Sequence, residues 1–270
     1  MTNIKKLIKK QYIIYLNWKN NRLYNKKYEV KSILDKKYTI TKGCIPEGSD
    51  YDDAWLLFLS SKSEIVFDVG CNIGQSSLLI THSNSLKKLI LIEPNPLSLS
   101  MAAENLIMNN KSENVIFIPK AAYNKSGVNI KLWSMQGAYA GASTDINFSE
   151  TGKISKNYFD VETITLDEIV ETYNYFPDLV KIDVQGAEND LIHGGEETLA
   201  SCKHLIVEMQ KVNYNDGAPL VGETMPYIES LGFTCVAPLF CDNGPDGDYG
   251  FVRIVTEKAT EGDKYVLLGK

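Results

Sequence analysis

An apolar strand that runs directly into a glycine-bearing turn and a helix is the feature that most constrains this chain. The segment IVFDVGCNIGQ occupies residues 65–75, and helix-forming residues follow as far as Thr81. A second apolar stretch, LILI, ends in Glu93. That acid follows the turn by about 20 residues, the spacing at which a strand-end acid meets the ribose of a bound nucleoside. The pattern therefore predicts a nucleoside-binding crevice in an α/β fold.

The residues of the turn indicate which nucleoside can bind. A dinucleotide fingerprint has three glycines, whereas here Asn72 takes the middle place and Gln75 the last. No Gly-Lys-Ser/Thr phosphate loop occurs, and no lysine or arginine lies within residues 64–85. Two carboxylates, Asp68 and Glu93, border the turn instead, and they suit a ligand with an ammonium and a sulfonium but no phosphate. The turn therefore predicts S-adenosylmethionine as the cofactor; an ordinary strand–turn–helix with a packing glycine would leave the acid pair unexplained.

Length and cysteine usage predict a cytoplasmic protein. The 270 residues are enough for one α/β domain or two small ones. No apolar run approaches the length of a membrane span, and the N-terminus lacks the apolar core and cleavage site of a signal peptide. The five cysteines form no CxxC pair and are odd in number, a pattern typical of reduced thiols. We therefore expect neither structural zinc nor disulfides.

The first 43 residues differ from the rest of the chain in charge. They hold 12 lysines and arginines against Glu29 and Asp35, a net charge of about +10, which leaves about −16 for residues 44–270. Apolar and aromatic residues between Ile4 and Trp18 recur at helical spacing. We therefore divide the chain into a basic helical N-terminal extension, residues 1–43, and a main domain, residues 44–270.

The basic extension has two interpretations. A helix within residues 1–27 could lie on an anionic membrane surface and make the protein peripheral there. It could instead pack on its own domain or on the second subunit of a homodimer, with its lysines solvated, and we favour this interpretation. Nucleic acid is not an expected partner, because the strongly acidic main domain would repel phosphates.

Beyond the extension, strand and helix patterns alternate. A short strand at 38–40 and a helix at 52–59 come first, and a hairpin-like insertion follows later at 128–133 and 160–164. The main strands are predicted at 65–69, 89–92, 115–118, 179–183, 204–208, 233–238 and 249–255, and the helices at 75–82, 96–109, 166–173, 187–192 and 222–231. This order predicts an α/β fold with a seven-stranded, mainly parallel Rossmann-like sheet, one antiparallel strand, and helices on both faces.

That order resembles the methyltransferase variant of the nucleotide-binding fold, and five segments narrow the resemblance to one family. They are FDVGCNIG at 67–74, IEPNP at 92–96, AA at 121–122, TLD at 165–167 and LVKIDVQGAE at 179–188. Together they resemble the FkbM family of S-adenosylmethionine-dependent methyltransferases. Cys71 replaces the alanine usual in the turn, and Gln185 stands where glutamate is also common. The resemblance implies O-methylation of a small-molecule or glycan acceptor, commonly a sugar hydroxyl or a natural product.

The expected cofactor-binding residues are Asp68, Gly70, Asn72, Gly74, Glu93, Ala121 and Ala122. Glu93 is expected to bind both ribose hydroxyls, and Asp68 to face the amino-acid end of the cofactor, partly through water. The two glycines let the backbone pass close to the cofactor, and Asn72 can supply amide hydrogen bonds. The two alanines form a flat apolar wall for adenine, with simple core packing as an equal alternative.

Catalytic groups are expected where the strands end, because the ligand of an open α/β sheet lies beyond their carboxyl ends. The three histidines are predicted to be remote from that edge, so the base is expected to be a carboxylate. Asp183 is the first candidate and Glu208 the second, since an alcohol acceptor needs a base. Either could instead orient sugar hydroxyls or, with Asp248, hold Mg²⁺ or Ca²⁺. No contiguous ligand motif occurs, so no metal is expected.

Two other functions stay open from the sequence. A nicotinamide-dependent oxidoreductase would use the same type of fold, although the missing middle glycine and the lack of phosphate-binding charge disfavour it. A non-catalytic scaffold could keep the fold and the cofactor, because the base is inferred only from its place at a strand end.

Overall fold

The computed structural model describes residues 27–43, 45, 51–134, 142–143, 157–211, 218–237 and 248–253. The chain divides into two compact units, residues 1–48 and residues 49–270. No helix in the described ranges is both long and apolar enough to cross a membrane.

The described part of the first unit is a β-hairpin. Strand β1 (Tyr28–Ile33) pairs antiparallel with β2 (Lys36–Thr41). Leu34 and Asp35 between them both have positive φ, as a two-residue hairpin turn of matching twist requires. The strand predicted at 38–40 is confirmed within β2, whereas β1 was not predicted. The prediction of a helical extension is therefore wrong for the hairpin. The residues that recur at helical spacing, between Ile4 and Trp18, lie outside the described residues.

The second unit alternates strands and helices largely as the sequence predicts. Its main strands are β3 (Ile65–Val69), β4 (Lys88–Ile92), β5 (Val115–Ile118), β10 (Leu179–Ile182), β11 (His204–Glu208), β12 (Phe233–Ala237) and β13 (Asp248–Arg253). Its helices are α2 (Tyr51–Ser60), α3 (Gln75–Ile80), α4 (Pro96–Met108), α5 (Leu166–Tyr173), α6 (Glu188–His193), α7 (Glu196–Ser201) and α8 (Val221–Ser230). Of these elements, only the short α7 was not predicted.

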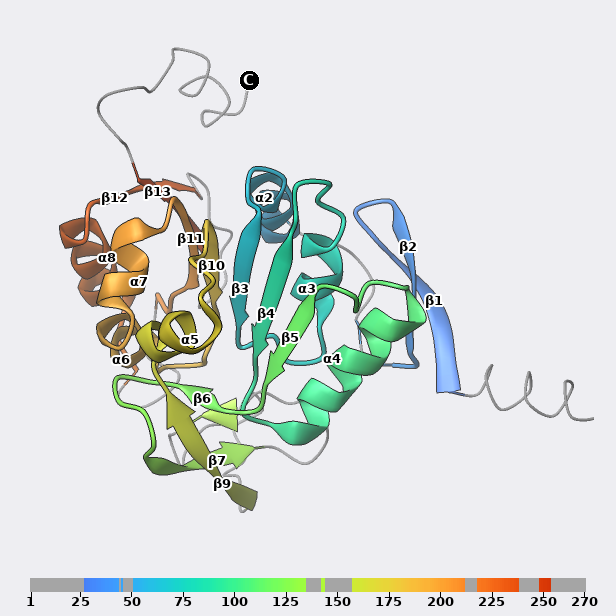
Figure 1. Ribbon diagram of the computed structural model, residues 1–270, viewed down its shortest axis with the longest axis horizontal. Helices are drawn as coiled ribbons and strands as arrows, with labels where there is room; N and C mark the ends of the chain where they lie inside the picture. The colour runs from blue at the N-terminus through green and yellow to red at the C-terminus, as the bar shows by residue number, and fades with distance from the viewer. Residues whose placement is uncertain are drawn as a thin grey trace, which may run out of the picture. The chain divides into compact units, whose positions relative to one another are not determined.

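The strands form one sheet in the order β12-β13-β11-β10-β3-β4-β5 (Figure 1). The five strands from β11 to β5 are parallel to their neighbours, and β13 runs antiparallel to both β11 and β12. The predicted α/β fold with a mainly parallel sheet is confirmed. Strands β4 and β5 follow β3 on one side of the sheet, and the chain then crosses to β10, which pairs with β3 on the other side. This reversal creates a switch point between β3 and β10, and ligands of open α/β sheets bind at the carboxyl ends of the strands there.

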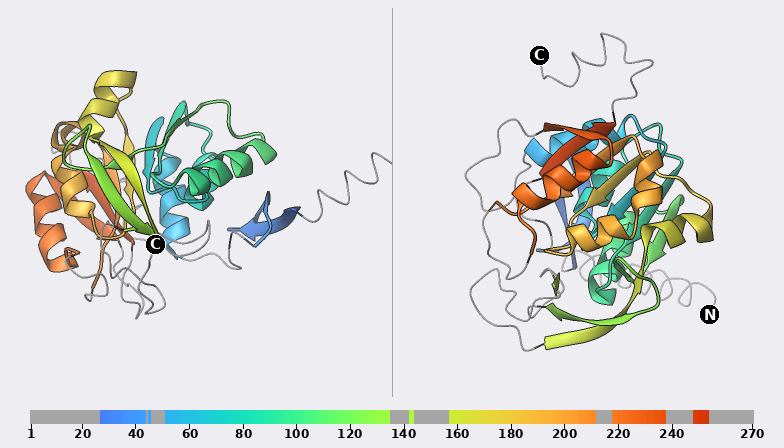
Figure 2. Two further views of the ribbon diagram at one scale, coloured as in Figure 1. Left: turned by 90° about the horizontal axis from the view of Figure 1, so that it is seen from below. Right: turned by 90° about the vertical axis from the view of Figure 1, so that its left-hand side faces the viewer.

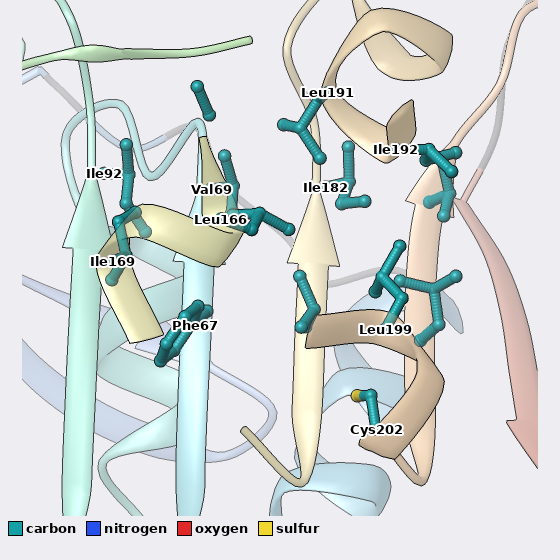
Figure 3. Close-up of a cluster of buried hydrophobic side chains, with 14 of the residues drawn as sticks. Phe67, Val69, Ile92, Leu166, Ile169, Ile182, Leu191, Ile192, Leu199 and Cys202 are labelled. Atoms are coloured by element: carbon teal, nitrogen blue, oxygen red, sulfur yellow. The ribbon is translucent and has the colours of Figure 1, made fainter. Parts of the chain in front are cut away.

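The two faces of the sheet carry different side chains. Alternate residues of the central strands, such as Phe67, Val69 and Ile182, join a large apolar core with residues of α5, α6, α7 and α8 (Figure 3). Because successive side chains of a strand point to opposite faces, Asp68 and Lys181 lie on the other face. Helix α3 covers that face, since its serines hydrogen-bond Asp68. By the same alternation, the acids at the strand ends, Glu93, Asp183 and Glu208, belong to the face of Asp68 and Lys181.

A second, smaller sheet begins directly after β5. It has the order β6-β9-β7-β8, with β6 (Ala121–Ala122), β7 (Asn129–Ser134), β8 (Ala142–Ser143) and β9 (Asn157–Ile164). Strands β7 and β9 pair antiparallel, which confirms the predicted hairpin-like insertion (Figures 1 and 2). Because β6 follows the end of β5, the small sheet starts at the carboxyl edge of the large one. Most of the segment between β7 and β9 lies outside the described residues.

Candidate active site

The turn after β3 is built from residues in left-handed conformation. Gly70, Asn72 and Gly74 have φ of 76°, 46° and 85°. A Cβ on Gly70 would lie 1.7 Å from the carbonyl oxygen of Asp183, and one on Gly74 would lie 3.0 Å from the Cβ of Ala102 in α4. The glycines were expected to make room for the cofactor. In the structure the atoms that crowd these two positions belong to the protein, and the close approach of the backbone to the cofactor stays a prediction.

Glu93 follows β4 and is held against the turn by two backbone amides. Its Oε2 accepts a hydrogen bond from Asn72 N at 3.0 Å, and its Oε1 accepts one from Asn95 N at 2.8 Å. The side chain is buried, and this burial raises the pKa of Glu93 to about 7 even though the two amide hydrogen bonds lower it. Each oxygen keeps one further lone pair. The carboxylate can therefore accept two hydroxyl hydrogens, as the ribose prediction requires.

Asp68 is fully buried in β3, and its two oxygens have different surroundings. Its Oδ2 accepts hydrogen bonds from Ser77 Oγ at 2.6 Å and Ser76 Oγ at 2.8 Å. Its Oδ1 and the Oδ1 of Asn72 are buried and have no hydrogen-bond partner among the described residues. Burial raises the pKa of Asp68, while the charge of Lys181 lowers it.

These two orphaned acceptors fit the predicted cofactor. A buried acceptor without a partner is costly, at about 1–3 kcal/mol, and S-adenosylmethionine carries ammonium, amine and hydroxyl donors that could satisfy it. The residues that would hold the cofactor are therefore Asp68, Asn72 and Glu93. Sequence reasoning did not identify the serines that anchor Asp68, although hydroxyls eight and nine residues after the acid, in the first turn of the helix, are a readable signal.

The two alanines of β6 pack into the protein interior. Ala121 belongs to a small apolar cluster with Leu132 and Val161, and Ala122 belongs to the main core. Both are buried and pair with β9. The packing alternative therefore accounts for these residues, and the adenine wall stays a prediction.

The predicted base candidates lie together beyond β10 and β11. Gln185 Nε2 donates to Asp183 Oδ1 at 2.9 Å and to Glu208 Oε2 at 2.6 Å. Gln185 has a positive φ of 56°, a conformation of non-glycine residues that is often found at functional sites. Lys181 Nζ lies 2.9 Å from Asp183 Oδ2. The two acids that the sequence selected are therefore joined by one amide, and Asp183 is also paired with a buried cation.

The pKa of Asp183 falls below its ordinary value. Burial raises it, but the charge of Lys181, the neighbouring Glu208 and the hydrogen bonds donated by Gln185 and Lys181 together outweigh burial. The direction of this shift favours the ionised form of Asp183. Sequence reasoning gave no role to Lys181, although a lysine inside the apolar strand LVKI is a visible exception to the pattern.

The contact between Asp183 and the turn places the base candidates beside the cofactor residues. Asp183 N donates to Val69 O at 3.0 Å, and its carbonyl oxygen occupies the space that a Gly70 side chain would fill. The ends of β3 and β10 therefore meet at the switch point. The half-buried carboxylate of Asp183 therefore belongs to a residue whose main chain contacts the turn after β3.

Other titratable groups differ in their relation to this site. Glu188, in the first turn of α6, accepts from Gly186 N at 3.0 Å, and burial raises its pKa to about 7. His204 begins β11 at the opposite edge, and burial lowers its pKa to about 4. Its remoteness, as predicted, argues against a histidine base. Among the described residues there is no cluster of His, Cys, Asp or Glu that could hold a metal; the side chain of Asp248 lies outside them.

The geometry agrees with a comparison against protein families. The model of the Methyltransferase FkbM domain matches residues 68–235, which begin at Asp68 and include Glu93, Asp183 and Glu208. The chain belongs to the FkbM methyltransferase family. It is therefore an S-adenosylmethionine-dependent methyltransferase, and the nicotinamide alternative is wrong.

The chain is also similar to two methyltransferases at the level of sequence. The chain is 25% identical over 202 residues to the 2-O-methyltransferase NoeI of Sinorhizobium fredii, covering 70% of this chain and 79% of the relative. It is 27% identical over 171 residues to the hexuronic acid methyltransferase AglP of Haloferax volcanii, covering 62% of this chain and 65% of the relative.

The chain also matches solved structures at low sequence identity. A methyltransferase FkbM from Methylobacillus flagellatus KT is 13% identical, with a TM-score of 0.48, over 70% of this chain and 43% of that one. The M. jannaschii TYW2 structure in complex with AdoMet is 16% identical, with a TM-score of 0.45, over 85% of this chain and 88% of that one. The assignment to the family rests on the family model.

Proposed function

We propose that this protein transfers a methyl group to a hydroxyl of a sugar or glycan. Similarity to a 2-O-methyltransferase supports an oxygen as the methylated atom, and similarity to a hexuronic acid methyltransferase supports a sugar as the acceptor. The site itself favours a neutral sugar over an anionic one such as a hexuronic acid, because the buried acids Asp68 and Glu93 and the half-buried Asp183 would repel a negative charge. Carboxylate and amide groups are also the usual partners of sugar hydroxyls.

The observation that carries this proposal is the position of the Asp183 carboxylate beside the turn after β3. Lys181 and Gln185 each hold one of its carboxylate oxygens, so the side chain has a defined direction. Its main chain touches Gly70. In open α/β sheets ligands bind at the switch point, and a base at this edge would therefore lie beside the substrate.

The bound cofactor would supply a methyl group already activated by its sulfonium. Asp68, Asn72 and Glu93 would bind and orient it through the acceptors described above. Asp183 would accept the proton from the acceptor hydroxyl as the carbon–oxygen bond forms. Its lowered pKa makes it a modest base, which suits proton transfer that accompanies bond formation rather than precedes it. Glu208, held through Gln185, would orient the acceptor.

A methyl-transfer screen with labelled cofactor against sugars, glycolipids and phenols tests the proposal. We expect turnover with a sugar-containing acceptor and none with phenols. Asp183→Asn should reduce turnover by about a hundredfold or more, a typical contribution of a general base, while its affinity for S-adenosylhomocysteine stays nearly unchanged. Glu208→Gln is the matched comparison, and its turnover should fall by less than that of Asp183→Asn.

Two outcomes would contradict the proposal. Loss of cofactor affinity in Asp183→Asn would make this residue part of cofactor binding rather than the base. Tight binding of S-adenosylhomocysteine without methyl transfer to any acceptor class would favour the non-catalytic scaffold.

The cysteine pattern supports a cytoplasmic protein, and the basic extension supports contact with a membrane surface or a second subunit. Residues 1–27 carry most of the excess of basic residues and the apolar stripe. An anionic membrane surface and a second subunit are the two candidate surfaces. A vesicle experiment, described in the Discussion, distinguishes them.

A further inference from the structure

Lys181 is a buried cation at the centre of the sheet. Among the side chains that the structure describes, it is the only buried lysine or arginine, with 6% of the residue exposed. It lies in β10 between apolar residues whose side chains point into the main core. A buried charge is stable in a protein only when it is paired. The acids around Lys181 therefore explain why a lysine is tolerated in this strand.

The strand geometry places Lys181 between two acids that have separate roles. Its Nζ lies 2.9 Å from Asp183 Oδ2, two residues further along the same face of β10. Asp68 is its register partner on the neighbouring parallel strand β3, and neighbouring strands are about 4.8 Å apart. Lys181 also lowers the pKa of Asp68 by its charge. Lys181 thus lies beside Asp68, an expected cofactor-binding residue, and is paired with Asp183, the proposed base.

The surroundings of Asp183 are otherwise strongly acidic. Its ionised form raises the pKa values of three buried neighbours, Asp68, Glu93 and Glu188. Charged groups therefore face it from β3, from the end of β4, from β10, from α6 and from β11: Asp68, Glu93, Lys181, Glu188 and Glu208. Within this set, four groups are acids and one is a cation. Without the cation, burial and mutual repulsion would favour a protonated Asp183.

We propose that Lys181 is a positioning residue that keeps the Asp183 carboxylate ionised and fixed in direction for the methyl-transfer reaction. The inference rests on the proposed role of Asp183 as the base. Only 7% of the Lys181 side chain is exposed, so it acts through Asp183 rather than by contact with the acceptor. The lowered pKa of Asp183, to which Lys181 contributes both charge and a hydrogen bond, agrees with this geometry.

The test replaces the cation and follows the ionisation of Asp183. Lys181→Met removes the charge and keeps the length of the side chain, and Lys181→Arg keeps the charge. We expect the acidic limb of the pH profile of kcat/KM to move upward by about one to three pH units in Lys181→Met, the effect of a nearby opposite charge. In Lys181→Arg the limb should move by much less. Should Lys181→Met fail to fold, Lys181→Gln carries the same test.

Lys203→Met is the matched control. Lys203 pairs with Asp178 at 2.6 Å, but at the opposite edge of the sheet and with its side chain 65% exposed. Its removal should leave the pH profile unchanged. A shift in this control of the size expected for Lys181→Met would overturn the proposal, and so would a folded Lys181→Met with the wild-type profile.

A second readout separates this inference from the function on which it rests. In protein labelled with ¹³C at aspartate carboxyl groups, the signal of Asp183 is identified by its absence from Asp183→Asn. Its titration midpoint should rise in Lys181→Met and stay low in Lys181→Arg, whatever acceptor the enzyme uses. If the wild type methylates no sugar but the midpoint rises, the acceptor class is wrong and the role of Lys181 stands. An unchanged midpoint refutes the role even if sugars are methylated.

Discussion

Gly70 offers the sharpest test of how the site is built. Its φ is 76°, and a Cβ there would lie 1.7 Å from the carbonyl oxygen of Asp183 and 2.7 Å from its carbonyl carbon. Both are main-chain atoms, so no side-chain rotation relieves the overlap. The hydrogen bond from Asp183 N to Val69 O also holds this strand end in place. Gly70→Ala must therefore separate the ends of β3 and β10.

Gly127 provides a matched control for the backbone conformation. Its φ is 72°, and nothing lies within 4 Å of the position of its Cβ. In Gly127→Ala the free energy of unfolding should fall only by the cost of an alanine in the left-handed conformation, about 1–2 kcal/mol. This corresponds to a fall in Tm of roughly 2–8 °C for a domain of this size. In Gly70→Ala the overlap with the backbone of Asp183 adds to this cost. We expect the free energy of unfolding to fall by at least ~4 kcal/mol, which is exceptional for a single substitution.

Urea unfolding of the two variants beside the wild type measures the difference. The affinity for S-adenosylhomocysteine, measured by calorimetry, should fall in Gly70→Ala and stay unchanged in Gly127→Ala. Equal losses of stability in the two variants would refute the reasoning, because their φ angles are alike and only the space around them differs.

The remaining predictions concern Glu93 and the extension. Glu93→Gln should weaken S-adenosylhomocysteine binding about ten- to hundredfold in calorimetry, because charge-assisted hydrogen bonds to the ribose are lost; unchanged affinity would refute the ribose assignment. Because the pKa of Glu93 is raised from 4.5 to about 7 in the folded protein, folding is favoured by its protonated form, and that contribution is lost as the pH rises from about 4.5 through 7. Glu93→Gln should therefore flatten the pH dependence of unfolding in this window, and Glu188→Gln should do the same without changing cofactor affinity, since its pKa is also raised to about 7. Deletion of residues 1–27 should abolish sedimentation with anionic vesicles if the extension binds membranes, and should instead dissociate a dimer or unfold the domain if it packs on protein.

The order and type of most elements could be predicted because their signals are local. Helix α5 was predicted at its observed bounds, since Thr165 caps its first turn by accepting from Glu168 N at 3.1 Å. The apolar runs of β3, β4 and β10 identify strands buried on both faces. The short α7 has no side-chain cap hydrogen bond, and β1 has no strong apolar pattern, so neither has a local signal of comparable strength.

The acids of the site could also be chosen from the sequence, because a carboxylate at the end of an apolar strand is exceptional. That rule selected Asp68, Glu93, Asp183 and Glu208. What each acid touches depends on residues distant in the chain. Glu93 is held by the amide of Asn72, 21 residues earlier, and Glu208 meets Gln185 across 23 residues.

The sequence alone determined the family and the cofactor, because these follow from short motifs. It also predicts the edge of the sheet for the chemistry, from the rule that parallel strands end together. Only the tertiary structure decided why Gly70 must be glycine, since the crowding atom belongs to Asp183, more than a hundred residues away. It also decided which charge state the acids adopt. That state depends on burial and on the single buried lysine of the described site, and neither is a property of any one segment.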